Sequence, residues 1–297
     1  MKVTSELPVR VLTHNIRYDT SAPFKGERPW PERQQLLFNE LNFHTRHNDN
    51  TFICLQEVLV NQLEDINRGL CAVSYPKPST PRWKFIGVGR DDGYCKGEFS
   101  PIFYQPSVWK LLHEDTVWLS KTPSKPSKSW DAASNRIVTI GVFIHRPSGR
   151  GILAMNTHLD DQGSRSRLEA ARIIHNKIKE YREVSKWKDL ISGTFLAGDL
   201  NSQETEEAYK ELTSHGHMRD TYMLVDASYR YGNHNTFTGF GYEEEPPSRI
   251  DYVLLHIPEI QKQTWKVNGY SVLPNQFDDG VFNSDHCAVV ADLTLVD

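Results

Sequence analysis

The sequence contains little cysteine, no long apolar run and no excess of basic residues, and each absence excludes a class of protein. Its four cysteines, Cys54, Cys71, Cys95 and Cys287, include no CxxC pair, so neither a zinc ribbon nor a redox motif is indicated. No apolar stretch approaches the roughly 20 residues of a membrane-spanning helix, and the first residues lack the apolar core of a secretion signal. We therefore expect a soluble intracellular protein that engages no membrane, with prior removal of a signal as the open alternative.

The net charge of −4 leaves no broad basic stripe for holding a long nucleic acid at many phosphates. A nuclease is not excluded, because a bound divalent cation would change the field inside the site. Hydrophobic residues make up 38% of the 297 residues and no segment is of low complexity, so the chain can bury a large core. We expect one globular domain over residues 1–297, since no linker divides it.

The apolar pattern predicts an alternation of strands and helices. Residues with helical spacing lie at 31–43, 58–70 and 166–187. Strand-like runs lie at 9–13, 51–56, 85–88, 100–104, 116–119, 136–144, 152–156, 194–200, 249–255 and 287–295. The strands between 85 and 156 are expected to form a meander. Two halves that are each rich in strands and helices predict two packed sheets with helices outside.

Chemically active side chains recur where the predicted strands begin or end. They are Asn15, Glu57, His158, Asp199 with Asn201, Asp251, and Asp285 with His286. Carboxylates, amides and imidazoles at strand ends contribute little to folding, whereas they suit a site for a hard metal ion with a general base. The repetition of this pattern predicts such a site.

Two of these segments carry alternating polar residues. Asp199 and Asn201 are two apart, so in an extended chain both point to one side and offer oxygen ligands to Mg²⁺ or contacts to a phosphate. An Asx-turn at a strand end is the structural alternative. His158 could likewise donate to a phosphoryl oxygen, with Asp160 on the same side, although a solvated histidine is the alternative.

The remaining acids also have structural alternatives. Glu57 follows a run that should be buried, where a carboxylate is costly unless it is paired or bound to metal, but it could also serve the first turn of the next helix. Asp251 could form a structural ion pair with Arg249. Asp285 and His286 could belong to a turn, yet adjacent acid and imidazole groups would let one serve a metal ion and the other act on water.

Taken together, these segments resemble the endonuclease/exonuclease/phosphatase superfamily, which includes DNase I-like nucleases and phosphatases. The matching pieces are Thr13-His14-Asn15, Leu55-Gln56-Glu57-Val58, Asn156-Thr157-His158-Leu159-Asp160, Gly198-Asp199-Leu200-Asn201, Arg249-Ile250-Asp251-Tyr252 and Ser284-Asp285-His286. They extend over nearly the whole chain. The resemblance implies a four-layer α/β sandwich, in which two packed mixed β-sheets are flanked by helices.

The resemblance also implies roles for individual residues. Glu57 would be the principal ligand of Mg²⁺, or of Mn²⁺ in its place, with Asn15 and Asp285 near the same ion. His286 would act as the general base for water, and Asp251 would hold its imidazole in the productive tautomer. Asp199 and Asn201 would orient the nucleophile and contact the scissile phosphate. His158, supported by Asp160, would stabilise charge on the phosphoryl oxygens.

Four further residues are candidates for substrate binding. Arg90 borders a Gly-containing loop, and Arg136 precedes a strand, where a surface salt bridge is the alternative. Tyr104 could donate to a phosphate or lie in the core. Arg165, with Arg167 nearby, could contact an anionic leaving group or simply be solvated at the start of a helix.

These observations predict a monomeric, metal-dependent phosphoesterase that uses water to attack phosphorus in line. The missing basic stripe favours a small or single-stranded phosphorylated substrate. An endonuclease or exonuclease acting on DNA or RNA is the first alternative. A non-catalytic binding protein on the same fold is the second, although such a protein has no physical need to keep Glu57, Asp251 and His286 together.

Overall fold

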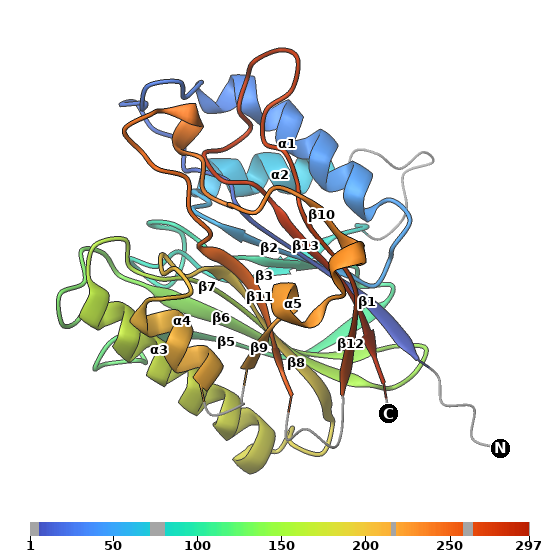
Figure 1. Cartoon of the computed structure of the whole chain (residues 1–297). Coiled ribbons are helices and arrows are strands. Elements are labelled where there is room, and N and C mark those ends of the chain that lie inside the picture. The colour runs from blue at the N-terminus through green and yellow to red at the C-terminus, as the bar shows by residue number, and fades with distance from the viewer. Residues whose placement is uncertain (1–5, 72–80, 215–217, 258–263, 297) are drawn as a thin grey trace.

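The computed structural model describes residues 6–71, 81–214, 218–257 and 264–296. In this part of the chain two mixed β-sheets pack face to face (Figure 1). The first has the strand order β10-β12-β13-β1-β2-β4-β3: β1 (Leu7–Asn15), β2 (Thr51–Gln56), β3 (Lys84–Ile86), β4 (Ile102–Tyr104), β10 (Arg230–Gly232), β12 (Trp265–Val272) and β13 (Val289–Leu295). The second has the order β5-β6-β7-β8-β11-β9: β5 (Trp109–Trp118), β6 (Ile137–His145), β7 (Gly151–His158), β8 (Ile191–Asp199), β9 (Met218–Asp220) and β11 (Asp251–His256).

Helices cover the outer face of each sheet. Those over the first sheet are α1 (Trp30–Thr45) and α2 (Val60–Cys71), and those over the second are α3 (Ser164–Lys179) and α4 (Glu207–Thr213) (Figure 1). The short α5 (Thr221–Leu224) contacts β11 and β12. Pro31 stands in the first turn of α1, where its missing N–H has no intrahelical partner to lose. None of the helices in the described ranges is long and apolar enough to span a membrane.

Three apolar clusters separate the layers. Val11 and Phe52 of the first sheet meet Phe143 and Phe195 of the second in the central cluster. Leu12, the neighbour of Val11, points the other way into the cluster beneath α1 and α2, as the two-residue period of a strand requires. A third cluster packs the outer face of the second sheet against α3 and α4. The predicted four-layer sandwich of two packed mixed sheets with outer helices is confirmed.

Some of the predicted elements differ from those observed. The strands from 85 to 156 are not one meander, because β3 and β4 pair with β2 in the first sheet and only β5, β6 and β7 form a meander in the second. The helix predicted at 166–187 ends as an α-helix at Lys179 and continues as a π-turn at Glu180–Val184. The strand β12 escaped prediction because a bulge between Val267 and Gly269 interrupts its alternation.

The central cluster gives a direct test of the packing. The ring of Phe52 lies 4.8 Å from that of Trp109, 5.1 Å from that of Phe143 and 5.4 Å from that of Phe195, centroid to centroid. We expect Phe52→Ala to lower the free energy of unfolding by about 3–5 kcal/mol, because it removes buried surface and leaves a cavity. Urea denaturation followed by circular dichroism measures this change. Phe43→Ala is the matched control, since Phe43 is 76% exposed, and an equal loss there would contradict the packing described.

The strand register carries several polar residues to one edge of the sandwich. Asn15 ends β1, His158 ends β7 and Asp199 ends β8, with β7 and β8 parallel and His158 opposite Asp199. Asp251 opens the antiparallel β11 and is also opposite Asp199. Gly198 allows this approach, because it has a φ of +141° and a Cβ there would collide with the carbonyl oxygen of Thr157. The fold therefore gathers residues that are far apart in sequence.

Candidate active site

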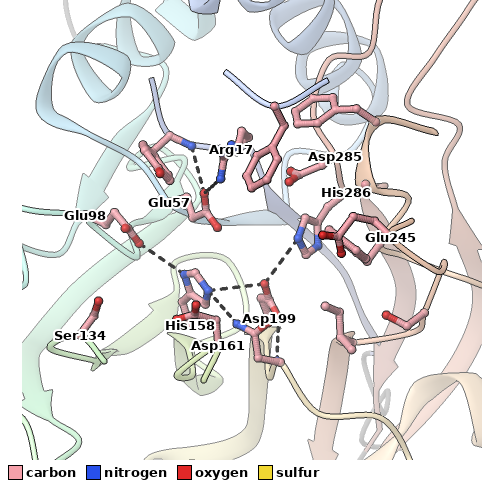
Figure 2. A pocket seen from close by; sticks show the side chains of 18 of the residues that line it. Arg17, Glu57, Glu98, Ser134, His158, Asp161, Asp199, Glu245, Asp285 and His286 are labelled. Atoms are coloured by element: carbon pink, nitrogen blue, oxygen red, sulfur yellow. Dashed lines mark hydrogen bonds and ion pairs between the residues drawn. The ribbon is translucent and has the colours of Figure 1, made fainter. Parts of the chain in front are cut away.

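A pocket of about 890 Å³ opens at this edge. The predicted residues that line it are Glu57, Arg90, Arg136, His158, Asp199, Asn201, Asp285 and His286. Figure 2 shows the labelled members pointing into one cavity. Three other predicted residues, Asn15, Asp160 and Asp251, are buried behind this lining and bond to residues of it. The structure thus brings together the carboxylate, amide and imidazole groups expected from the sequence.

His286 and Asp251 form a buried pair. The Nδ1 atom of His286 lies 2.8 Å from Oδ2 of Asp251, while its Nε2 faces the pocket, 3.7 Å from Oδ2 of Asp199. Burial lowers the pKa of His286, but the carboxylates of Asp251, Asp199 and Asp285 outweigh burial and raise it to about 10. The Oγ1 atom of Thr236 accepts the backbone N–H of Asp251 at 3.0 Å and helps to hold the pair.

Asp199 occupies the centre of the site. Its Oδ2 accepts a hydrogen bond from Nδ2 of Asn15 at 2.9 Å, and its Oδ1 accepts one from the backbone N–H of Asn201 at 2.8 Å. Burial and the neighbouring Asp251 raise the pKa of Asp199. Ligand atoms of Asp199, Asp251 and His286 all lie within 4.8 Å of one another, so these three residues form a possible metal site.

A second group of carboxylates lies beside this centre. Glu57 accepts hydrogen bonds from Nδ2 of Asn15 at 3.0 Å and from the backbone N–H of Tyr18 at 3.1 Å. Asp285 shares the pocket with Glu57, and burial together with the Glu57 charge raises the pKa of Asp285 against the lowering effect of His286. The guanidinium of Arg17 lies 4.0 Å from Glu57. Asn15 offers its N–H groups to two carboxylates, which makes it the residue that positions Glu57 relative to Asp199.

The backbone around the pocket adopts sparsely populated conformations. Five non-glycine residues in the described ranges have a positive φ, and the four that line the pocket are Arg17, Glu57, Asn201 and Phe240. Each such conformation costs on the order of 1–3 kcal/mol and persists only where the surroundings hold it. Such a concentration of sparsely populated conformations at one pocket is typical of functional sites.

His158 lies on the other side of Asp199 from His286. Its Nε2 is 3.0 Å from Nδ2 of Asn201 and 3.6 Å from Oδ2 of Asp199, and its Nδ1 is 3.5 Å from Oε2 of Glu98. Burial and the Arg136 charge lower the pKa of His158 to about 4. The imidazole is therefore neutral at physiological pH and can take part in hydrogen bonds without adding charge.

The expected support of His158 by Asp160 is wrong. The carboxylate of Asp160 accepts backbone N–H groups of Ala133, Ser134 and Gly163 at 2.8–3.1 Å and lies 3.4 Å from Nε of Arg136. Asp160 therefore builds the loop before β6 and holds Arg136 at the pocket.

Two predicted substrate contacts lie elsewhere. Tyr104 is buried in the central cluster, with its ring 4.9 Å from that of Phe143, because the pairing of β4 with β2 turns this side chain inward. Arg165 is exposed at the start of α3 and does not line the pocket, whereas Arg167 lines it. These positions correct two predictions, namely that Tyr104 contacts a phosphate and that Arg165 contacts the leaving group.

The sequence indicates no specific role for Arg17 or Glu98, although both line the pocket. Glu98 pairs with Arg90 at 2.6 Å, and the two residues stand at opposite ends of a Gly-containing loop. An acid and a base in these positions are the only sign in the sequence that Glu98 belongs to the site. Arg17 had no comparable signal beyond its position two residues after Asn15.

A family model described as the endonuclease/exonuclease/phosphatase family matches residues 12–286. Solved structures of similar proteins agree. A family protein from Bacteroides vulgatus is 30% identical, with coverage of 97% of this chain and 99% of that chain and a TM-score of 0.80. The mannosyl-6-phosphatase of Bacteroides thetaiotaomicron is 29% identical, with coverage of 96% and 99% and a TM-score of 0.79.

A curated relative is more distant. Human Nocturnin is 20% identical over 98% of this chain and 66% of that protein, so the chain spans about two thirds of the length of this relative. One of the similar solved structures is that of a phosphatase. These structures share the expected DNase I-like arrangement of two mixed sheets with this chain. The chain belongs to the endonuclease/exonuclease/phosphatase family.

Proposed function

We propose that the protein is a divalent-metal-dependent hydrolase of small phosphate esters that uses water as the nucleophile. The observation that carries the proposal is the His286–Asp251 pair, whose free imidazole nitrogen faces Asp199 in the same pocket as Glu57 and Asp285. A base for water and a set of anionic oxygen ligands are the two components that metal-assisted hydrolysis requires.

The donor set fits a hard cation. Glu57 and Asp285 place two carboxylates in one pocket, where burial, and after it the Glu57 charge, raise the pKa of Asp285. Oxygen ligands of this kind suit Mg²⁺ or Mn²⁺. Asp199, Asp251 and His286 are less suited to the main ion, because coordination there would compete with the 2.8 Å bond that orients the imidazole. A cation held by Glu57 and Asp285 would stabilise negative charge on the phosphoryl oxygens.

His286 takes the proton of the attacking water in this proposal. The imidazole is protonated while the surrounding carboxylates are uncompensated, since these raise its pKa to about 10. A cation beside Asp285 would remove one of the charges that raise this pKa and so favour the neutral imidazole that accepts a proton, which couples the base to occupation of the acidic pocket. Asp251 fixes the proton on Nδ1 and so leaves Nε2 to face the water.

His158 and Asn201 act on the phosphate. The Nδ2 atom of Asn201 is already held by the carbonyl oxygen of Leu159 at 3.0 Å, and its second N–H direction points to Nε2 of His158. A phosphoryl oxygen that enters between these two side chains would replace their mutual contact and accept a hydrogen bond from each, which stabilises developing charge. We assign both residues to contacts with the phosphoryl oxygens, with Asp199 orienting the nucleophile between the two imidazoles.

The charges of the pocket favour a compact substrate. The lining arginines number four and the lining carboxylates seven: Glu57, Glu98, Asp161, Asp199, Glu206, Glu245 and Asp285. The arginines are also engaged within the protein, as in Arg17 with Glu27 at 3.2 Å and Arg136 with Asp161 at 2.6 Å. Such a pocket cannot neutralise a chain of phosphates. Similarity to the mannosyl-6-phosphatase supports hydrolysis of a phosphate monoester.

Turnover of small and polymeric substrates over a salt series tests this proposal. We expect metal-dependent phosphate release from a small monoester, with kcat/KM nearly constant between about 50 and 200 mM NaCl because few phosphates are gripped. Single-stranded and duplex oligonucleotides, assayed with Mg²⁺, Mn²⁺ and EDTA, are the comparison. Efficient oligonucleotide cleavage with a steep loss of activity at high salt, beside poor turnover of every small ester, would favour the nuclease instead. Binding without any turnover would favour the non-catalytic alternative.

A further inference from the structure

We infer that the leaving group of the substrate is an uncharged, hydroxyl-rich small molecule, such as a monosaccharide or polyol, and that Ser134, Arg136 and Asp161 select it. This inference rests on the proposed function, because it takes the pocket to be the site of phosphate ester hydrolysis. It adds the chemical class of the leaving group and the residues that recognise it.

The position of the leaving group follows from the direction of attack. The interactions form a row in which Glu98 lies 3.5 Å from His158, His158 lies 3.6 Å from Asp199, and Asp199 lies 3.7 Å from His286. Figure 2 shows this row, with His286 at one end of it and Glu98 at the other, where Ser134 also lies. In-line displacement places the leaving oxygen opposite the attacking water. Because His286 activates the water, the leaving group extends toward the pocket wall beyond His158. The residues of this wall that line the pocket include Arg90, Glu98, Ser134, Arg136 and Asp161.

That wall consists of closely paired charges. Nη2 of Arg136 lies 2.6 Å from Oδ1 of Asp161, and Nη1 of Arg90 lies 2.6 Å from Oε2 of Glu98. Asp160 adds a further carboxylate 3.4 Å from Nε of Arg136. Arg167 also lines the pocket and donates to the backbone carbonyl of Asp160 at 3.0 Å, so three arginines and three carboxylates balance one another here. A second phosphate or a nucleotide backbone would have to compete with carboxylates that already pair with Arg90 and Arg136 at 2.6 Å, and this disfavours an anionic leaving group.

The same wall retains unused hydrogen-bonding capacity. Arg136 is only 7% exposed, and its Nη1 makes no hydrogen bond, with Glu98 4.0 Å away, although the side chain lines the pocket. The side chain of Asp161 is 47% exposed and offers acceptors, and the half-buried Ser134 offers a hydroxyl. An apolar leaving group would cover Asp161 and Ser134 without offering them a hydrogen bond, which is costly. A hydroxyl group both donates and accepts, so neighbouring hydroxyls can pair with the guanidinium and the carboxylate together.

The size of the pocket agrees with this class of ligand. A volume of about 890 Å³ accommodates a phosphate and one or two sugar rings, and it lies within the usual range for small-molecule sites. The rings of Tyr18 and Phe24 also line the pocket and provide apolar surface for the C–H groups of such a ring. Phe24 is 54% exposed, and the guanidinium of Arg17 lies over its ring, 4.9 Å from the centroid.

The test compares two substrates in two variants. Asp161→Asn and Ser134→Ala should each lower kcat/KM for a hexose 6-phosphate by about tenfold, as expected for one lost polar contact. The same variants should leave kcat/KM for p-nitrophenyl phosphate within about twofold, because its leaving group makes no such contact. Asp189→Asn, which removes an exposed acid outside the pocket, is the matched control. Thermal unfolding confirms that each variant is folded.

Three outcomes would overturn the inference. An equal loss on both substrates would assign Asp161 and Ser134 a structural role. Preference of the unaltered protein for a sugar bisphosphate or a nucleotide over the hexose monophosphate would show that the wall accepts anions. Absence of metal-dependent phosphate release from every ester, p-nitrophenyl phosphate included, would refute the proposed function and this inference with it, whereas turnover of p-nitrophenyl phosphate without preference for hydroxylated esters would refute the inference alone.

Discussion

Replacement of His286 by alanine is expected to reduce kcat on a small phosphate ester by about 100- to 10,000-fold, the range typical of a lost general base. The reason is geometric: the imidazole is fixed by Asp251 at 2.8 Å, and its other nitrogen is the group that faces the water position beside Asp199. KM should change little, because the imidazole takes part in proton transfer and not in holding the ester. Steady-state kinetics with saturating Mg²⁺ measures both parameters.

The partner and control variants make this result specific. Asp251→Asn should produce a comparable defect, since an amide does not stabilise the imidazolium or fix the tautomer in the same way. His47→Ala removes an exposed histidine and should retain normal turnover. Nearly normal kcat in His286→Ala, in a protein that unfolds at the usual temperature, would transfer the role of base to another residue, and Asp199 would be the first to examine.

The strand-end residues could be predicted because they depend on local pattern. Asn15, His158 and Asp199 each terminate an apolar run, and the ends of parallel strands meet at one edge of a sheet. The approach of Asp251 to His286 is different, since it joins the start of β11 in one sheet to the segment that precedes β13 in the other. Only the family resemblance indicated that contact beforehand.

Local periodicity also produced the main error within the site. His158 and Asp160 are two apart in sequence, which would place both on one side of an extended chain. The strand β7 ends at His158, so the alternation no longer applies and Asp160 turns to the loop that carries Ala133 and Ser134. The carboxylates near His158 are those of Glu98 and Asp199, which both lie far away in sequence. A contact of this kind depends on tertiary structure and leaves no periodic signal.

The face of a short strand is equally difficult to predict. Tyr104 ends β4, and nothing in the three residues of this strand indicates which side of the sheet its ring takes. Pairing with β2 and β3 places it against Phe143 in the core. Arg17 shows the opposite case, in which a left-handed backbone with φ of 57° turns a side chain into the pocket directly after a regular strand.

Glu57→Gln is expected to have the second large effect, because it removes one charge from the pair of carboxylates that we assign to the metal ion while keeping the shape of the side chain. A metal ion contributes several kcal/mol to stabilising the transition state, so kcat/KM should fall by about 1,000-fold. Binding of Mg²⁺ should weaken in parallel, which isothermal titration calorimetry measures without reference to activity.

Thermal unfolding distinguishes loss of a ligand from damage to the fold. In the ion-free protein Glu57 raises the pKa of Asp285 by repulsion, so Glu57→Gln relieves that repulsion and should not lower the unfolding temperature. The substituted amide side chain would keep an oxygen to accept the N–H of Asn15. Wild-type protein should gain stability when Mg²⁺ is added, because a ligand that binds only the folded state shifts the equilibrium toward it, and the variant should lose most of that gain.

Glu245→Gln removes an exposed carboxylate from the rim of the same pocket and controls for net charge. If Glu245→Gln weakened Mg²⁺ binding as much as Glu57→Gln does, the ion would be held by the overall acidic field of the pocket, and the assignment of Glu57 as its ligand would have to be abandoned.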